Sequence, residues 1–179
     1  MQLNAAKSAL ENLFDLFNGQ NSQTLTPAEL DVSVPAVRVP DADPRNTTVV
    51  ITAKAGSETH KGSQTFTFTR LDINQIATIK TLGEFQSVEG STLVDAKAFV
   101  VAALGLIPAE VDFVESVFPT FSDEENESET ATLTLKAKDG SYSYLGELTL
   151  TVVEPVDGRE RLSELYTSTQ LDGFEYPVA

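Results

Sequence analysis

Histidine and cysteine, two of the side chains that most often carry enzymatic chemistry, are nearly missing from this chain. His60 is the single histidine, it sits beside Lys61 in a polar stretch, and there is no cysteine. A Ser–His–Asp arrangement would need His60 next to a seryl hydroxyl and a supporting carboxylate. Tyr144 occupies the matching position in the second half of the chain, so the pattern does not require a histidine. We interpret His60 as an exposed turn residue and exclude zinc sites of the usual kinds.

Carboxylates are the other candidates, and the densest run is residues 122–129, of sequence SDEENESE. Calcium prefers six to eight oxygen ligands, but the spaced Asp-x-Asp-x-Asp-Gly pattern is missing. A solvated loop is the interpretation, and ion binding by Asp123–Glu129 stays open as the alternative. Neither a glycine-rich phosphate motif nor a cleft around paired carboxylates is indicated. The sequence therefore predicts no enzyme and no catalytic, cofactor-binding or metal-binding residue.

Composition limits the partners that the chain can have. The 179 residues include 41% hydrophobic residues and carry a net charge of −15. This charge would repel nucleic acid and anionic lipid, so we expect neither as a partner. No apolar run approaches the roughly 18 residues of a membrane span. We also expect no secretory signal at the first residues, and the lack of cysteine fits synthesis in a reducing compartment.

The chain repeats itself along its length. Residues 27–31 (PAELD) return as 108–112 (PAEVD) at an offset of 81. Residues 53–57 (AKAGS) and Gly62 return as 137–141 (AKDGS) and Gly146 at an offset of 84. Residues 82–85 (LGEF) return as 171–174 (LDGF) at an offset of 89, with Ile73 and Ile76 near Leu162 and Leu165, and Ala6-Lys7 matches Ala96-Lys97. The offset grows in loop-like segments, as expected for insertions between fixed elements. The sequence predicts two tandem modules, residues 1–90 and 91–179.

Each predicted module has the same order of elements. Helical spacing at residues 10–17 and 99–104 predicts a helix in each half. Period-two alternation then predicts two hairpins, formed by residues 49–54 with 65–69 and by 131–138 with 148–152. A helical turn near 73–76 or 162–165 and a strand through Phe85 or Phe174 complete each half. The predicted fold class is a β-rich α+β chain, each module a short helix packed on a small, mostly antiparallel sheet.

Aromatic side chains near the chain ends and in the second hairpin turn are the candidate partner contacts. The N-terminal helix and the C-terminal segment, residues 171–177, are candidate anchors for a partner protein. The alternative is that both pack on the sheet of their own module. Hairpin edges can add strands from neighbouring subunits, and Pro35, Pro40 and Pro119 indicate edge protection. The candidate partner-contact residues are Phe14, Phe17, Tyr142, Tyr144, Phe174 and Tyr176.

Residues 46–57 (NTTVVITAKAGS) and 62–72 (GSQTFTFTRLD) resemble the tandem modules of virion structural proteins of large tailed bacteriophages. Those chains alternate a short helix with Thr/Val-rich strands and often close on a segment like residues 171–174. The resemblance extends over nearly the whole chain, twice, and consists of strand and turn chemistry. It implies a non-enzymatic virion component, made in the host bacterial cytoplasm, whose partners are other virion proteins in multiple copies.

The small size and the lack of fibre-like repeats favour a head or neck accessory or decoration protein over a tail or baseplate component. A second class is an immunoglobulin-like adhesin that binds glycans or a surface protein, and Tyr142 and Tyr144 would favour it if exposed. A third class, a hydrolase, would require an activity that depends on His60 or on particular carboxylates.

Overall fold

The computed structural model describes residues 2–39, 43–121 and 129–154, and it is a β-rich α+β fold, as the sequence predicts. The first half contains α1 (Ala9–Asn21), β1 (Leu30–Val32), β2 (Ala36–Val37), β3 (Thr47–Ala53), β4 (Ser63–Phe68), β5 (Leu71–Asp72), α2 (Ile73–Lys80) and β6 (Phe85–Gln86). The second half contains α3 (Leu93–Leu104), the 3-10 turn η1 (Pro108–Glu110), β7 (Val111–Phe113), β8 (Thr130–Ala137), β9 (Tyr144–Leu145) and β10 (Glu147–Val153). No helix in these described ranges is long and apolar enough to cross a membrane.

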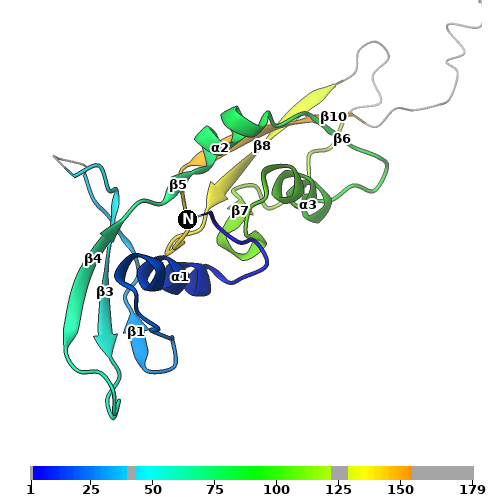
Figure 1. Ribbon diagram of the computed structural model, residues 1–179. Coiled ribbons are helices and arrows are strands. Elements are labelled where there is room, and N and C mark those ends of the chain that lie inside the picture. The colour runs from blue at the N-terminus through cyan, green and yellow to red at the C-terminus, as the bar shows by residue number, and fades with distance from the viewer. Residues whose placement is uncertain (1, 40–42, 122–128, 155–179) are drawn as a thin grey trace, which may run out of the picture.

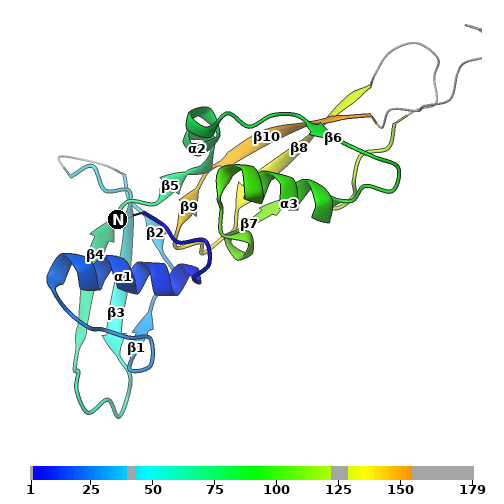
Figure 2. The same ribbon diagram turned by 45° about the vertical axis from the view of Figure 1, so that its right-hand side comes forward.

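The first sheet is built around β3. The predicted hairpin is confirmed, because β4 pairs antiparallel with β3 from Thr52↔Ser63 to Thr47↔Phe68. Since β4 covers one edge of β3, both β1 and β2 lie along the opposite edge. Helix α1 lies across this sheet (Figures 1 and 2). The core between them consists of Leu13, Phe14, Phe17, Leu30, Val49, Ile51 and Phe68.

The second sheet has the strand order β6–β10–β8–β7. Strands β8 and β10 form the second predicted hairpin and alternate buried and exposed side chains along β10. This period of two places Leu148, Leu150 and Val152 in the second core, beside α3. The two sheets lie toward opposite ends of an elongated molecule, and β10 runs away from the first sheet (Figure 2).

Equivalent positions of the two sheets pair in the same register. Leu30 pairs with Ala53 in the first sheet, and Val111 pairs with Ala137 in the second. These partners are related by the offsets of 81 and 84. The glycines also match, because the Ala53 amide donates to the Gly62 carbonyl at 2.9 Å and the Ala137 amide to the Gly146 carbonyl at 3.0 Å.

The segment that follows β4 leaves the first sheet. β5 pairs in parallel with β9, and α2 then packs on β10. β6 also pairs in parallel with β10. The helix near Ile73–Ile76 and the strand at Phe85 are therefore confirmed, but both lie on the second sheet, although residues 73–86 fall within the predicted first module. The Ala6-Lys7 match has no structural counterpart, because these residues precede α1 whereas Ala96-Lys97 lies inside α3.

Both long helices begin with a capping box. Ser8 accepts from the Glu11 amide while Glu11 accepts from the Ser8 amide, and Thr92 and Asp95 do the same at α3. Hydrogen bonds from Ser8 lower the pKa of Glu11 below 4.5, and hydrogen bonds from Thr92 lower the pKa of Asp95 below 3.8. Both carboxylates therefore favour the folded state in the ionised form.

Acid is expected to weaken the fold through these caps. A carboxyl whose pKa is depressed by folding contributes stability above its unfolded pKa, and that contribution is lost as the pH falls through the folded pKa. The Asp95→Asn variant should therefore show a shallower loss of unfolding free energy below pH 3.8 than the wild type. Urea denaturation followed by circular dichroism at several pH values measures this slope, and an unchanged slope would contradict the role of Asp95.

Candidate assembly surface

The outer edge of β10 is covered by β6 and α2. Phe85 pairs with Val152, and the Ser87 amide donates to the Val153 carbonyl at 3.1 Å. The Phe85 ring lies 5.5 Å from that of Phe99 and 6.2 Å from that of Phe118, measured between centroids. Strand β6 therefore completes the second sheet, and its Phe85 side chain packs against α3 and the loop after β7.

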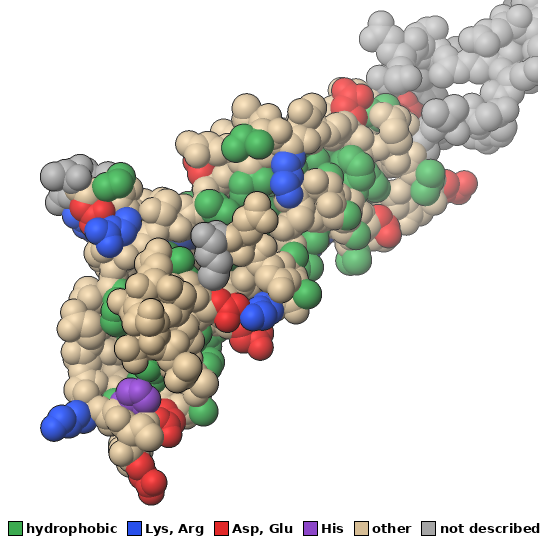
Figure 3. Space-filling model, viewed as in Figure 1, with side chains coloured by type: hydrophobic (Ala, Val, Ile, Leu, Met, Phe, Trp, Pro, Cys, Tyr) green, Lys and Arg blue, Asp and Glu red, His purple; other side chains and the backbone are tan. Residues whose placement is uncertain are grey.

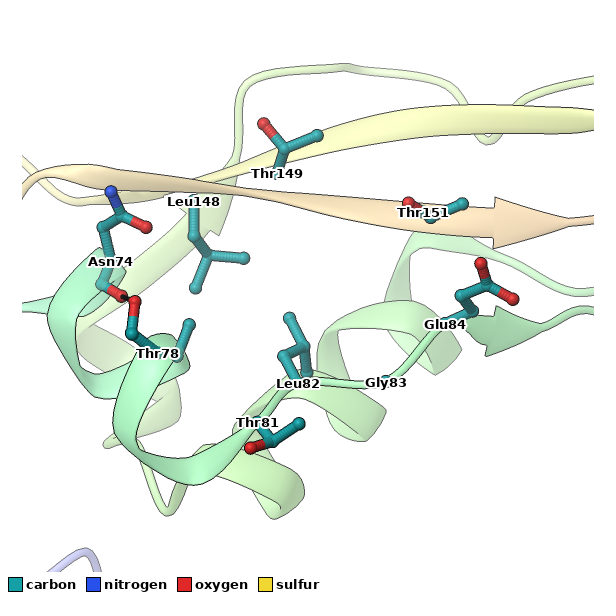
Figure 4. Close-up of a pocket in the computed structure, with 10 residues that line it drawn as sticks. Asn74, Thr78, Thr81, Leu82, Gly83, Glu84, Leu148, Thr149 and Thr151 are labelled. Carbon is teal, nitrogen blue, oxygen red and sulfur yellow. Dashed lines mark hydrogen bonds between the residues drawn. The ribbon is translucent and has the colours of Figure 1, made fainter.

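Between α2 and β10 lies a groove of about 430 Å³. Figure 4 shows Leu82 and Leu148 on opposite sides of it, with Thr149 and Thr151 along β10. Its remaining lining residues are Asn74, Ala77, Thr78, Thr81, Gly83 and Glu84. Glu84 is the one titratable side chain among the described residues that line it. Across the described part of the chain, no group of three His, Cys, Asp or Glu residues could hold a metal ion.

In the described ranges, the equivalent edge of the first sheet carries no further strand. Among the residues that the structure describes, β3 is the only strand that pairs with β4. Ser63, Gln64 and Thr65 are exposed, and Phe66 is half-buried against the Phe17 ring at 4.9 Å. An edge strand with unpaired backbone groups is a template for another strand. We define the outer edge of β4, residues 63–69, as the β4 edge.

The orientation of the free backbone groups along the β4 edge follows from the hydrogen-bond pattern. Because Gly62 bonds to Ala53, the alternation of an antiparallel pair directs residues 64, 66 and 68 toward β3. Thr65, Thr67 and Thr69 then direct their amides and carbonyls outward. Val153, the counterpart of Thr69 at an offset of 84, directs its carbonyl to Ser87 in the same way.

His60 lies in the exposed turn before β4, as the sequence predicts. Its Nδ1 is 3.0 Å from Oε2 of Glu29, and the two side chains are 38% and 40% exposed (His60 is purple in Figure 3). Hydrogen bonds from Thr59 and His60 lower the pKa of Glu29. Glu110 holds the equivalent turn, accepting from Ser141 Oγ at 2.7 Å. The geometry around His60 thus braces a turn.

The junction between the sheets is polar and buried. Arg70 is 5% exposed, and it donates from Nε to Thr47 Oγ1 at 2.9 Å and from an Nη to the Ser141 carbonyl at 2.8 Å. Burial lowers the pKa of Arg70. The Tyr142 hydroxyl donates to the Ser33 carbonyl at 3.2 Å, and its ring packs against both cores. Arg70 and Tyr142 therefore couple the two sheets.

Three of the candidate partner contacts lie in the interior, which corrects the expectation from sequence. Phe14 and Phe17 are 3% and 4% exposed because α1 turns them onto the first sheet. Tyr144 is 1% exposed because it fills the second core, where its oxygen accepts from the Ile107 amide at 3.0 Å. Such side chains present no surface to a partner. Tyr142 is half-buried, and it packs between the two sheets.

Two further candidates, Phe174 and Tyr176, lie outside the described residues, as does most of the acidic run, residues 122–128. Apolar side chains that the sequence analysis did not single out are exposed instead. They are Val34, Val37, Val39, Ile79, Val88, Val94, Val114 and Val117. Figure 3 shows further apolar side chains on the face that carries α2 and α3. Most of these residues lie in loops or singly on the outer face of a helix, so the period of the apolar residues could not identify them.

Comparisons with known proteins give one match. A family model described as a family of unknown function (DUF7941) matches residues 2–179. No curated protein and no solved structure matches the chain significantly.

Proposed function

The chain belongs to this family of unknown function, and we propose that it is a non-enzymatic structural component of a tailed-phage virion that acts by packing against other virion proteins. The observation that carries the proposal is the β4 edge: within the described part of the chain, β4 pairs with β3 alone. Strand addition supplies main-chain hydrogen bonds to any partner that offers an extended segment. The exposed valines add apolar area that association would bury.

The duplication belongs to the same proposal: two tandem modules descend from one unit. Its support is the shared register of β1–β3 and β7–β8, together with the matched turns at Gly62 and Gly146. Further support comes from Glu29 and Glu110, which accept hydrogen bonds from Ser57 and Ser141 in the equivalent turns. In a duplicated unit each module contacts only its neighbours along the chain, so the two ends of the molecule remain as surfaces for other chains.

Within the virion we propose a head or neck accessory or decoration role, with a tail or baseplate position as the alternative. The net charge of −15 fits contacts with basic protein surfaces and disfavours direct contact with packaged nucleic acid. The adhesin alternative loses part of its support, because exposed Tyr142 and Tyr144 would favour it and Tyr144 is 1% exposed.

Purified particles test the proposal. We expect the chain in gradient-purified virions at many copies per particle, measured by quantitative mass spectrometry, and we expect a particle reconstruction to place it at the head or neck. Retention after a high-salt wash distinguishes an assembled subunit from an adsorbed protein, because screening weakens surface charge contacts. Presence in infected cells but absence from washed particles would overturn the proposal.

A further inference from the structure

Residues 70–86 follow the last strand of the first sheet and form part of the second sheet. They begin directly after β4, yet Ile73 is 0% exposed within the second core and β6 is an edge strand of the second sheet. Arg70 opens the segment by bonding to the Ser141 carbonyl, and Leu71 follows by donating from its amide to the Ser143 carbonyl at 2.9 Å. A segment that starts in one module therefore supplies a helix and a strand to the next.

The chain contains this segment a second time. At the offset of 89, Arg159 corresponds to Arg70, Leu162 to Ile73, Leu165 to Ile76, Leu171 to Leu82 and Phe174 to Phe85. Residues 159–176 follow β10 as residues 70–87 follow β4. We define residues 159–176 as the donor segment.

Among the residues that the structure describes, no strand occupies the corresponding place on the first sheet. The offset of 84 relates Val152 and Val153, which pair with β6, to Phe68 and Thr69 at the β4 edge. It likewise relates Ser141, which accepts from Arg70, to Ser57. Gln64 stands where β10 has Leu148, so apolar contact is expected mainly at Phe66 and Phe68. The described residues contain two four-stranded sheets, and one helix–strand segment, α2–β6, which lies on the second of them.

We propose that the donor segment of one copy docks on the β4 edge of a second copy, so that chains associate head to tail. This inference rests on the proposed function and names the partner of that surface. Strand β10 ends at the end of the molecule remote from the first sheet (Figures 1 and 2). A donor segment that continues in the same direction, as residues 70–86 do after β4, therefore leads away from the chain's own β4. Phe174 then pairs with Phe68, as Phe85 pairs with Val152.

This contact is heterologous, because different surfaces of the two copies meet. Such contacts generate a closed ring when the rotation between copies closes, and an open filament when it does not. Each added copy brings a new acceptor and a new donor, so association continues until closure.

Two single variants separate the donor from the acceptor. Phe174→Asp places a charge where its counterpart Phe85 contacts two rings, and it leaves the β4 edge intact. Thr67→Pro removes an outward amide of the β4 edge, and the β3–β4 hydrogen bonds at residues 66 and 68 remain. Ser168→Asp is the matched control, because its counterpart Ile79 is 82% exposed. Circular dichroism melting curves check that every variant folds.

The measurement is size-exclusion chromatography with light scattering on the full chain, from micromolar to millimolar concentration. The wild type and Ser168→Asp should reach at least twice the mass of one chain, while Phe174→Asp and Thr67→Pro each remain at one chain. An equimolar mixture of the two variants should form a dimer and stop there, because one intact donor meets one intact acceptor.

A wild type that remains a single chain throughout overturns the inference, and so does a mixture that forms no dimer. A monomeric wild type whose melting temperature falls with Phe174→Asp would show that the donor segment folds back on its own sheet, which also overturns it. The proposed virion role fails separately, by absence from washed particles.

Discussion

The Tyr144→Ala variant is expected to lose about 3–5 kcal/mol of unfolding free energy, the usual cost of truncating a buried aromatic side chain to alanine. Tyr144 is 1% exposed among the residues of the second core, and neighbouring strands cannot collapse fully into the space left by the ring. Its hydroxyl oxygen also accepts from the Ile107 amide. Urea denaturation followed by circular dichroism gives the difference from the wild type.

His60 provides the matched control, since it occupies the equivalent turn position at an offset of 84. His60→Ala should change the unfolding free energy by less than about 0.5 kcal/mol, because its side chain is exposed and its contact with Glu29 is solvated. Tyr144→Phe isolates the hydrogen bond and should cost about 1–3 kcal/mol, since the buried Ile107 amide loses its acceptor. Equal effects of the two alanine substitutions would contradict the different packing of the two turns.

The Gly146→Ala variant is expected to lose about 2–3 kcal/mol of unfolding free energy. A residue other than glycine at a φ of +78° costs about 1–2 kcal/mol, and a Cβ at this position would lie 2.7 Å from Asp72 Oδ1. That oxygen caps α2 by accepting from the Asn74 amide at 2.9 Å, and losing such a cap costs about 1 kcal/mol. Thermal and urea denaturation measure the combined effect.

Gly62→Ala is the control for this prediction. Gly62 has a φ of +83°, but its added Cβ would meet no atom within 4 Å. Gly62→Ala should therefore lose only the unfolding free energy that a non-glycine residue costs at a positive φ, about 1–2 kcal/mol. The additional unfolding free energy lost by Gly146→Ala measures the contact between the second hairpin and the start of α2. Equal losses in the two variants would mean that Asp72 moves aside without cost.

Local patterns predicted the elements well. The period-two runs gave both hairpins, and the spacing of Leu10, Leu13 and Phe17 gave α1. The short helix at Ile73 and the strand at Phe85 were also predicted, because their apolar residues recur within a few positions. Periodicity reports which face of an element is apolar, and this information is local.

The partners of those faces could not be predicted in the same way. The apolar spacing of α2 does not specify which sheet it covers, and the structure places it on β10, after Arg70 has bonded to the Ser141 carbonyl. Tyr144 and His60 share a turn position, yet one is buried and the other exposed, because η1 brings Ile107 onto Tyr144. The β4 edge follows from the strand order, which no single run of residues encodes.

The pairing of β6 with β10 also has a consequence for synthesis on the ribosome. Ser87, just after β6, and its acceptor Val153 are separated by 66 residues. At roughly 5–20 residues per second, α2 and β6 emerge about 3–13 s before the strand that shelters them. During that interval β6 lacks the strand with which it pairs and α2 lacks the strand on which it packs, so their apolar side chains remain exposed until β10 is synthesised.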